Sequence, residues 1–391
     1  MNSKRVAMRL LRCALMALLL LPLAGCWSRV EVNDRAFVMS MYIDAAPNNK
    51  VELTVNFPLP NHLTTQTNAG ASADSPPFAS VSAKGMTLAE AYRELNSDLS
   101  REIYWGQTKT IVVGKAFAER GIAPLLEFIS RNPQFPIKTF VMVAPGKAKE
   151  ISTIKPRLET QPSDVFREYA NRRVLLDTSI RDCMMAEEYG SNFIIGMLDI
   201  RRIKEFDKTE PRVITDGGAY FKGGKLAAII DERGMRGAMW LMNRMEDAVI
   251  TVPSPSDGKP VSIIIYRTHT SIKPRMEGDR PVFHAVMKPI AQIMSIDSEV
   301  DYGSPERVEE IEQAFNEDIK KRVMTAFQLS KSLGSDVFQL GAYLNWHMPR
   351  QWKLLEPSWE ELYREEAVLE VEVQTRLELP GMQARKSSHR Q

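Results

Sequence analysis

The residue with the clearest chemical role in this sequence is a cysteine near the N-terminus. Cys26 follows Leu23, Ala24 and Gly25, at the end of an apolar stretch that begins at Cys13. A cysteine in this setting is typical of the site where a diacylglycerol is attached to the thiol through a thioether bond and the freed amine is acylated. The sequence therefore predicts a covalent lipid on Cys26, and it predicts no other cofactor and no metal.

The residues before this cysteine have the composition of a bacterial lipoprotein export signal. Lys4, Arg5, Arg9 and Arg12 precede the apolar stretch without an acidic residue, and that stretch is too short to span a bilayer as a helix. An ordinary secretory signal, with Cys26 near the cleavage site by chance, is the alternative. We expect residues 1–25 to be a signal peptide and the mature chain to be tethered to the outer face of the cell membrane.

The mature chain is nearly neutral. Residues 1–25 hold four basic and no acidic residues, so their removal changes the formal net charge from +2 to −2. Because phosphate binding requires a basic surface, we expect no nucleic-acid partner. Cys183 remains as the only cysteine besides Cys26, so no intramolecular disulfide can form, and we expect its thiol to be a buried, small apolar group.

Periodic apolar patterns predict an N-terminal α+β domain over residues 26–205. Apolar, β-branched runs predict strands at residues 35–43, 51–57, 80–83, 110–113 and 139–143. Thr87 and Glu90 form a capping box that begins a helix, and further helical patterns cover residues 122–131, 163–176 and 180–188. Short strands that alternate with helices indicate a layered domain with mixed secondary structure.

The rest of the chain predicts two more segments with secondary structure and a tail. A small middle module is expected at 206–258, with a hairpin around Lys222-Gly223-Gly224 and a helix capped by Asp231. A C-terminal α+β domain is expected at 259–382, with an amphipathic helix from Pro305 and one closing strand from Val368 to Leu379. Residues 383–391 are expected to be disordered. The predicted fold is therefore an elongated α+β body of about three domains.

The sequence contains no recognisable catalytic or metal-binding motif. There is no Gly-x-Ser-x-Gly elbow, no phosphate-binding glycine loop, no His-Glu-x-x-His and no Cys-x-x-Cys. The histidines are far apart in the sequence and lack metal-ligand spacing; they are His62, His269, His284, His347 and His389. We therefore expect a protein that is not an enzyme.

Aromatic residues gather late in the chain. Trp346, Trp352 and Trp359 lie close to Tyr343 and Tyr363, with prolines between them. Such a cluster either fills a corner of the last domain or forms a surface on which a partner docks, and core packing is the more common use. The three tryptophans are a candidate docking surface on this reasoning.

Several segments resemble the C-subunit lipoproteins of spore germination, the Ger(x)C family. The resemblance begins at Gly25-Cys26-Trp27-Ser28-Arg29-Val30-Glu31-Val32-Asn33-Asp34, although Ser28 stands where the family often has Asp. It continues, in the family's order, through Lys84-Gly85-Met86-Thr87-Leu88, the segment Tyr104 to Gly114 (with Gln107 where the family often has His), the segment Gly217 to Gly237, and Ser335 to Gly341 with Trp352-Lys353 and Trp359. These matches extend over nearly the whole mature chain.

The resemblance implies both a fold and a function. It implies an elongated three-domain α+β body that serves as the C subunit of a nutrient germinant receptor. The expected partners are two integral-membrane receptor subunits, and the expected location is the inner membrane of the dormant spore. A substrate-binding lipoprotein of a membrane transporter is the alternative, and it would need two lobes around a polar cleft. An envelope hydrolase would need a nucleophile or a metal site, for which the sequence offers no candidate.

Overall fold

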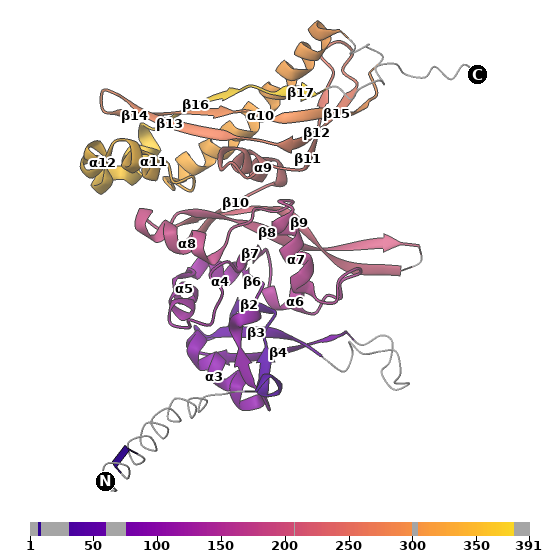
Figure 1. Ribbon diagram of the computed structural model, residues 1–391, viewed down its shortest axis with the longest axis vertical. Coiled ribbons are helices and arrows are strands. Elements are labelled where there is room, and N and C mark those ends of the chain that lie inside the picture. Colours follow the sequence, from indigo (N-terminus) through magenta and orange to yellow (C-terminus); the bar gives the residue numbers. More distant parts are fainter. Residues whose placement is uncertain (1–6, 9–30, 60–75, 207, 299–303, 379–391) are drawn as a thin grey trace.

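The computed structural model describes residues 7–8, 31–59, 76–206, 208–298 and 304–378. Apart from residues 7–8, the predicted signal peptide lies outside these residues, as do the lipid site Cys26 and the predicted tail 383–391. The sheets define an N-terminal unit, within residues 31–230, and a C-terminal unit, within residues 248–378. Figure 1 shows the two units stacked along the long axis of the molecule, with the start of the body at the end opposite the C-terminal unit. The predicted elongated, multidomain α+β fold is confirmed.

The N-terminal unit is built on an eight-stranded mixed sheet in the order β10-β9-β8-β7-β6-β2-β3-β4. The central strands β2, β6, β7 and β8 are parallel, and the strands at both edges are antiparallel. The bounds are β2 Ser40–Ala45, β3 Val51–Pro58, β4 Phe78–Gly85, β6 Thr110–Gly114, β7 Phe140–Ala144, β8 Phe193–Glu205, β9 Lys208–Lys222 and β10 Lys225–Ile230. A separate parallel pair, β1 Arg35–Phe37 with β5 Glu102–Tyr104, lies at the start of the body.

Helices cover both faces of this sheet, because its central strands are apolar on both sides. One core contains Met41, Ile43 and Cys183 and the inward faces of α3 Leu88–Asp98, α4 Lys115–Arg120, α5 Ala123–Ser130 and α8 Ile180–Ala186. Cys183 is fully buried, as expected, and burial raises the pKa of its thiol. The opposite core contains Tyr42 and Val112, with α6 Ala148–Ser152 and α7 Pro162–Asn171 packed over them.

The C-terminal unit consists of two small sheets and one long helix. The sheets have the orders β11-β12-β15-β17 and β13-β14-β16. Their strands are β11 Ala248–Pro253, β12 Pro260–Arg267, β13 Thr270–Glu277, β14 Arg280–Met287, β15 Ile290–Ile296, β16 Val368–Val373 and β17 Arg376–Glu378. Helix α10, Pro305–Leu333, buries Ile311, Phe315, Ile319 and Val323 against them, which is the face that the spacing predicts. Three short helices follow: α11 Leu340–His347, α12 Pro349–Leu355 and α13 Trp359–Glu365.

Two sequence expectations differ from the structure. Residues 206–258 do not form a module of their own, because β9 and β10 belong to the eight-stranded sheet whereas β11 belongs to the C-terminal unit. The expected boundary at 205 and 206 therefore falls at the turn of the β8–β9 hairpin, and the boundary between units falls near α9, Glu232–Leu241. The closing strand is also broken. β16 pairs with β14 in one sheet, and β17 pairs with β15 in the other.

Candidate functional site: the junction between the two units

The two units share one hydrophobic core. The cluster that begins with Tyr42 and Val112 beneath the eight-stranded sheet continues through Met235 and Trp240 of α9 to Phe315 of α10. Because apolar side chains from both units are excluded from water together, separating the units would expose surface on each of them. The junction is therefore held by the burial of apolar side chains from both units, and we take it as the candidate functional site.

Buried hydrogen bonds join the units at the end of the junction nearest the β9–β10 turn. The hydroxyl of Tyr220 donates to the carbonyl of Ala326 at 3.2 Å, and the hydroxyl of Ser335 donates to the carbonyl of Phe221 at 2.7 Å. The ammonium of Lys222 donates to the carbonyl of Leu333 at 2.9 Å. Desolvation raises the pKa of Tyr220, so its phenol stays protonated and keeps its proton as a donor. These bonds connect β9 to the C-terminal end of α10.

Helix α9 approaches α10 closely enough that one position must be glycine. A Cβ atom on Gly237 would lie 2.1 Å from the backbone oxygen of Arg322. The lack of a side chain at Gly237 allows the two backbones to come together, because the distance between packed helices depends on the size of the side chains at their contact. Arg233 of α9 also pairs with Asp318 of α10 at 2.6 Å, and Asp318 in turn pairs with Arg322.

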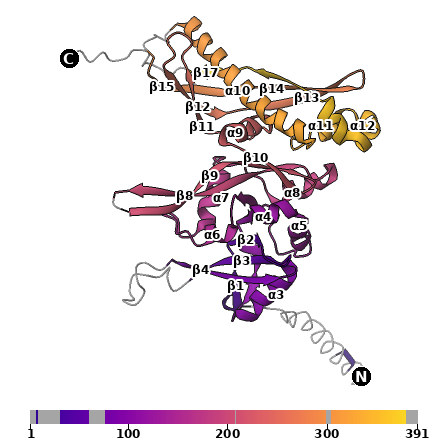
Figure 2. The same ribbon diagram turned by 180° about the vertical axis from the view of Figure 1, so that it is seen from behind.

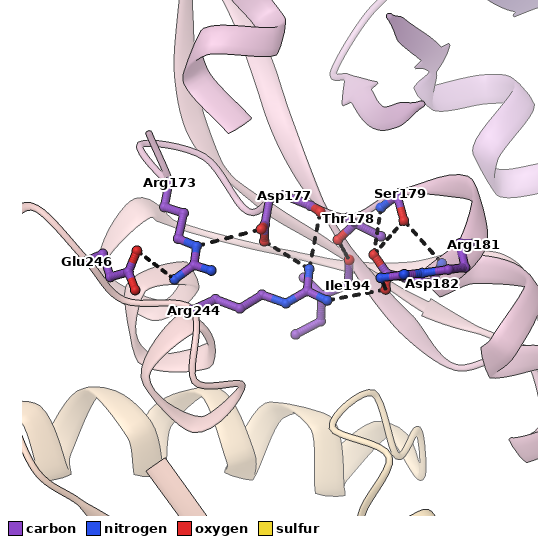
Figure 3. A network of polar contacts seen from close by, with 9 residues as sticks. All are labelled: Arg173, Asp177, Thr178, Ser179, Arg181, Asp182, Ile194, Arg244 and Glu246. Carbon is purple, nitrogen blue, oxygen red and sulfur yellow. Dashed lines mark hydrogen bonds and ion pairs between the residues drawn. The ribbon is translucent and has the colours of Figure 1, made fainter. Parts of the chain in front are cut away.

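An ionic network joins the segment after α9 to the N-terminal unit (Figure 3). Nη1 of Arg244 donates to Oδ1 of Asp177 at 2.9 Å and to the carbonyl of Asp177 at 3.2 Å, and Nη2 lies 3.4 Å from Asp182. In a second ion pair the signs are exchanged: Arg173 of the N-terminal unit pairs at 3.0 Å with Glu246, which follows α9. Asp182 has a second task, because it forms a capping box with Ser179 that begins α8. The network therefore fixes the connecting segment to α8 and to the loop before it.

A buried carboxylate organises the short helices beside the junction. The two oxygens of Asp336 accept N–H bonds from Leu340 at 2.9 Å, from Gly341 at 2.7 Å and from Nε1 of Trp359 at 3.0 Å. Burial raises the pKa of Asp336, and the three donors oppose that change because they favour the charged form. The carboxylate thus ties the start of α11 to α13.

The structure separates the three tryptophans of the candidate docking surface. Trp352 and Trp359 are 4% and 8% exposed, and their rings lie 5.4 Å apart at 70° in the core. Trp346 is 66% exposed and contacts Tyr343. Core packing is therefore the role of Trp352 and Trp359, because side chains so deeply buried cannot meet a partner. Only Trp346 is on the surface.

A cavity of about 940 Å³ opens at the same end of the junction. The N-terminal unit contributes Tyr189 and Lys222, and the C-terminal unit contributes Trp352, Glu360 and Arg364. Lys222 and Glu360 form an ion pair across it. Among the residues described, no group of three His, Cys, Asp or Glu side chains is close enough together to hold a metal ion. None of the described helices has the length and apolar character needed to cross a membrane.

Two family profiles match the chain one after the other. Residues 28–200 match the spore germination protein N-terminal domain, and residues 216–381 match the C-terminal domain described as spore germination B3/GerAC-like. The chain belongs to the Ger(x)C family of spore germination proteins. The gap between the two profiles, residues 201–215, covers the distal part of the β8–β9 hairpin.

Relatives of this Ger(x)C chain in Bacillus subtilis (strain 168) align with it over nearly their full lengths. Spore germination protein KC is 25% identical, covering 97% of this chain and 98% of its own. YfkR, which is named provisionally as a spore germination protein, is 28% identical, covering 97% of this chain and 98% of its own. The crystal structure of the GerBC protein is 16% identical, covers 86% of this chain and 96% of that chain, and superposes with a TM-score of 0.58, which shows a shared fold.

Most contacts at the junction of this Ger(x)C protein could not be predicted from the sequence. Arg244 and Asp177 are 67 residues apart, and each alone reads as an ordinary surface charge. Gly237 did carry a signal, because a glycine within a helical pattern often marks a close approach of another segment. Asp336 carried a weaker one, since it lies just before a helix, but its bond to Trp359 depends on tertiary structure.

Proposed function

We propose that this chain is the lipid-anchored C subunit of a nutrient germinant receptor, a non-enzymatic component that acts beside two integral-membrane subunits. Membership of the Ger(x)C family supports a role in spore germination. The motif at Leu23-Ala24-Gly25-Cys26 supports a diacylglycerol and an N-acyl chain on Cys26. Two or three acyl chains give lasting attachment, whereas one chain binds reversibly. The location that we propose is the outer face of the spore inner membrane.

The observation that carries this proposal is the continuous junction. The shared core, the Tyr220 and Ser335 hydrogen bonds and the Arg244 network hold the two units in one orientation. A body of this kind transmits a displacement from one end to the other, because its parts cannot move separately without exposing apolar surface. The proposed role is therefore mechanical coupling or docking within the receptor.

The anchor determines which end of the body faces the membrane. Four residues separate Cys26 from Glu31, the first residue of the body, so the Cα atoms of Cys26 and Glu31 lie at most about 18 Å apart. The end that carries β1 and β5 therefore lies near the lipid surface. Figure 1 places the C-terminal unit at the opposite end of the long axis.

The decisive experiment compares Cys26→Ala with Cys183→Ala in spores. We expect Cys26→Ala to leave the membrane fraction and to impair germination with nutrients. The matched control Cys183→Ala removes a thiol that is fully buried, so it should stay in the membrane fraction and support germination. Normal nutrient germination by a soluble Cys26→Ala protein at wild-type abundance would contradict the proposed importance of the anchor.

The inter-unit cavity favours a second candidate, a substrate-binding lipoprotein of a membrane transporter. Its lining has aromatic rings and charges of both signs, which suit a small polar ligand. A pull-down from detergent-solubilised spore membranes separates the two candidates. Two multispanning proteins encoded beside this chain would support the receptor subunit, whereas a permease with an ATPase would support the transporter.

A further inference from the structure

The distal part of the β8–β9 hairpin is a two-stranded ribbon that leaves the body of the molecule. It comprises residues 199–206 and 208–214, paired from Asp199 with Ile214 to Glu205 with Lys208. Figures 1 and 2 show it projecting sideways from the middle of the long axis, past the other strands of its sheet. No neighbouring strand is paired with it there, since β7 and β10 pair only with the proximal part. The ribbon therefore has two unpaired edges and an exposed tip, and none of its described side chains is fully buried.

The tip of the ribbon and the loop beside it each carry an apolar side chain that is almost wholly exposed. Phe206 is 97% exposed and Leu158 is 96% exposed. Arg157 forms ion pairs with Glu205 and Glu210, so the loop that holds Leu158 is fixed beside the ribbon. Phe206 has a φ of +52°, a conformation that favours Gly or Asn over a bulky aromatic residue. Folding therefore gains nothing from a phenylalanine here, which points to a contact outside the chain.

The acidic residues of the ribbon are confined to one of its faces. Residues paired across an antiparallel ladder point to the same side, and alternate pairs share a face. One face bears Arg202 and Lys204 beside Thr209 and Pro211, and it holds no acidic residue. The other face bears both signs: Asp199, Glu205 and Glu210 lie there with Arg201, Lys208 and Arg212. The carboxylates of Glu205 and Glu210 pair with Arg157 of the neighbouring loop. None of the ion pairs found among the described residues involves Arg202 or Lys204. One side of the ribbon is thus cationic and unneutralised, directly behind an apolar tip.

We propose that the exposed side chains of Phe206 at the tip and Leu158 on the loop beside the ribbon, together with the cationic face of Arg202 and Lys204, make a second, reversible contact with an anionic lipid surface. This inference rests on the proposed lipid anchor, because the anchor places the body on the membrane. Apolar side chains enter the boundary between headgroups and acyl chains, and nearby cations attract anionic headgroups. Since the anchor makes this contact intramolecular, a weak interaction is sufficient. Two points of contact would fix the tilt of the body, which a single point of attachment cannot do.

The contact can be observed with one fluorescent label on the lipidated, processed protein. Cys26 is then acylated and Cys183 is fully buried, so Leu158→Cys supplies the accessible thiol for an environment-sensitive dye. The protein is placed on vesicles of phosphatidylcholine and phosphatidylglycerol that contain a nitroxide-labelled lipid. We expect a blue-shifted emission and strong nitroxide quenching. The same dye on Met294→Cys, which is 63% exposed on β15 of the C-terminal unit, should remain in water.

Matched variants assign the contact to the residues that we name. Phe206→Asn suits the positive φ and so preserves the turn, and it should reduce quenching of the label at Leu158→Cys. Arg202→Gln and Lys204→Gln should each lower the inserted fraction, by about fivefold on an anionic surface. Arg350→Gln with Lys353→Gln removes two exposed cations from α12 in the C-terminal unit and should have no effect.

Vesicle flotation distinguishes failure of this inference from failure of the anchor. Protein that does not float with the vesicles lacks the proposed lipid attachment. Protein that floats while its label at Leu158→Cys stays unquenched overturns the lipid contact and leaves the anchor intact. A label that is shielded in spore membranes and exposed on lipid vesicles also overturns it, because the tip would then meet a protein subunit.

Discussion

The guanidinium of Arg244 and the carboxylate of Asp177 meet at 2.9 Å, and this ion pair closes 67 residues of chain into one junction. Replacing Arg244 by Gln removes its contacts with Asp177 and Asp182 and leaves two carboxylates near each other. We expect the free energy of unfolding in urea to fall by about 1 to 3 kcal/mol, because these hydrogen bonds are charge-assisted. Arg236→Gln is the control, since it removes an exposed pair within one helix turn and should cost less than about 0.5 kcal/mol. Equal losses would contradict the importance of the network.

Gly237→Ala tests the helix crossing. Alanine normally stabilises a helix relative to glycine, but here its Cβ would overlap the backbone oxygen of Arg322. We expect a loss of about 1 to 3 kcal/mol in thermal or urea unfolding, as for other overpacked sites. A Cβ on Gly146 meets only a carboxylate oxygen at 4.0 Å, so Gly146→Ala should be close to neutral. Stabilisation by Gly237→Ala would show that the helices are free to move apart.

Asp336→Asn tests the buried carboxylate. An amide can accept at its oxygen only. Its NH₂ group would therefore face N–H donors that have a carboxylate oxygen as acceptor in the wild type and would lose it in the variant. We expect the variant to lose about 1 to 3 kcal/mol of stability at neutral pH. Asp231→Asn is the control, because Asp231 caps α9 and asparagine caps helices equally well. A loss no greater than that of the control would mean that the site accommodates the amide.

The same residue predicts a pH dependence. Burial raises the pKa of Asp336 from its ordinary value of 3.8, so the folded state binds this proton more tightly than the unfolded state. Its contribution to stability therefore falls as the pH rises from 3.8 through the folded-state pKa, and returns on acidification. When the free energy of unfolding in urea is measured across this pH interval, the decrease due to Asp336 should be present in the wild type and absent from Asp336→Asn. Burial also raises the pKa of Asp44, so Asp44 should contribute its own pH dependence of stability in both proteins.

The tryptophans make a further paired prediction. Trp359→Ala removes a buried ring and its bond to Asp336, so it should cost about 3 to 5 kcal/mol in urea unfolding. Trp346→Ala removes an exposed ring and should change stability by less than about 0.5 kcal/mol. If Trp346 docks on a receptor subunit, co-purification of that subunit would fall in Trp346→Ala at unchanged stability. A large loss of stability in Trp346→Ala would contradict its surface position.

Local patterns predicted many of the individual elements. Thr87 accepts a hydrogen bond from the backbone of Glu90 as the capping box predicts, although Glu90 reaches Met86 instead of Thr87. Asp231 caps its helix, and the turn at Gly223 and Gly224 has the positive φ values that such a hairpin requires. These features are decided by a few neighbouring residues, so the sequence is sufficient to find them.

Features set by distant segments were missed. The ribbon of β8 and β9 has no fully buried side chain, so Arg201, Arg202 and Lys204 interrupt the apolar alternation that would mark a strand. The alternation from Val368 to Leu377 continues through Gln374 and Thr375, where the chain passes from one sheet to the other. Periodicity reports which face is buried, and it does not report the partner strand.

That passage from β16 to β17 has a consequence for the order of folding during synthesis. The eight-stranded sheet has all its strands once Ile230 has emerged, because β10 is its last member. Each sheet of the C-terminal unit instead receives its final strand from residues 368–378, nearly at the end of the chain. The first unit can therefore form while the second is still incomplete, with β14 and β15 waiting as open edges. Loss of the last strands to truncation or proteolysis would leave both sheets unfinished, and exposed strand edges of this kind are sites of aggregation.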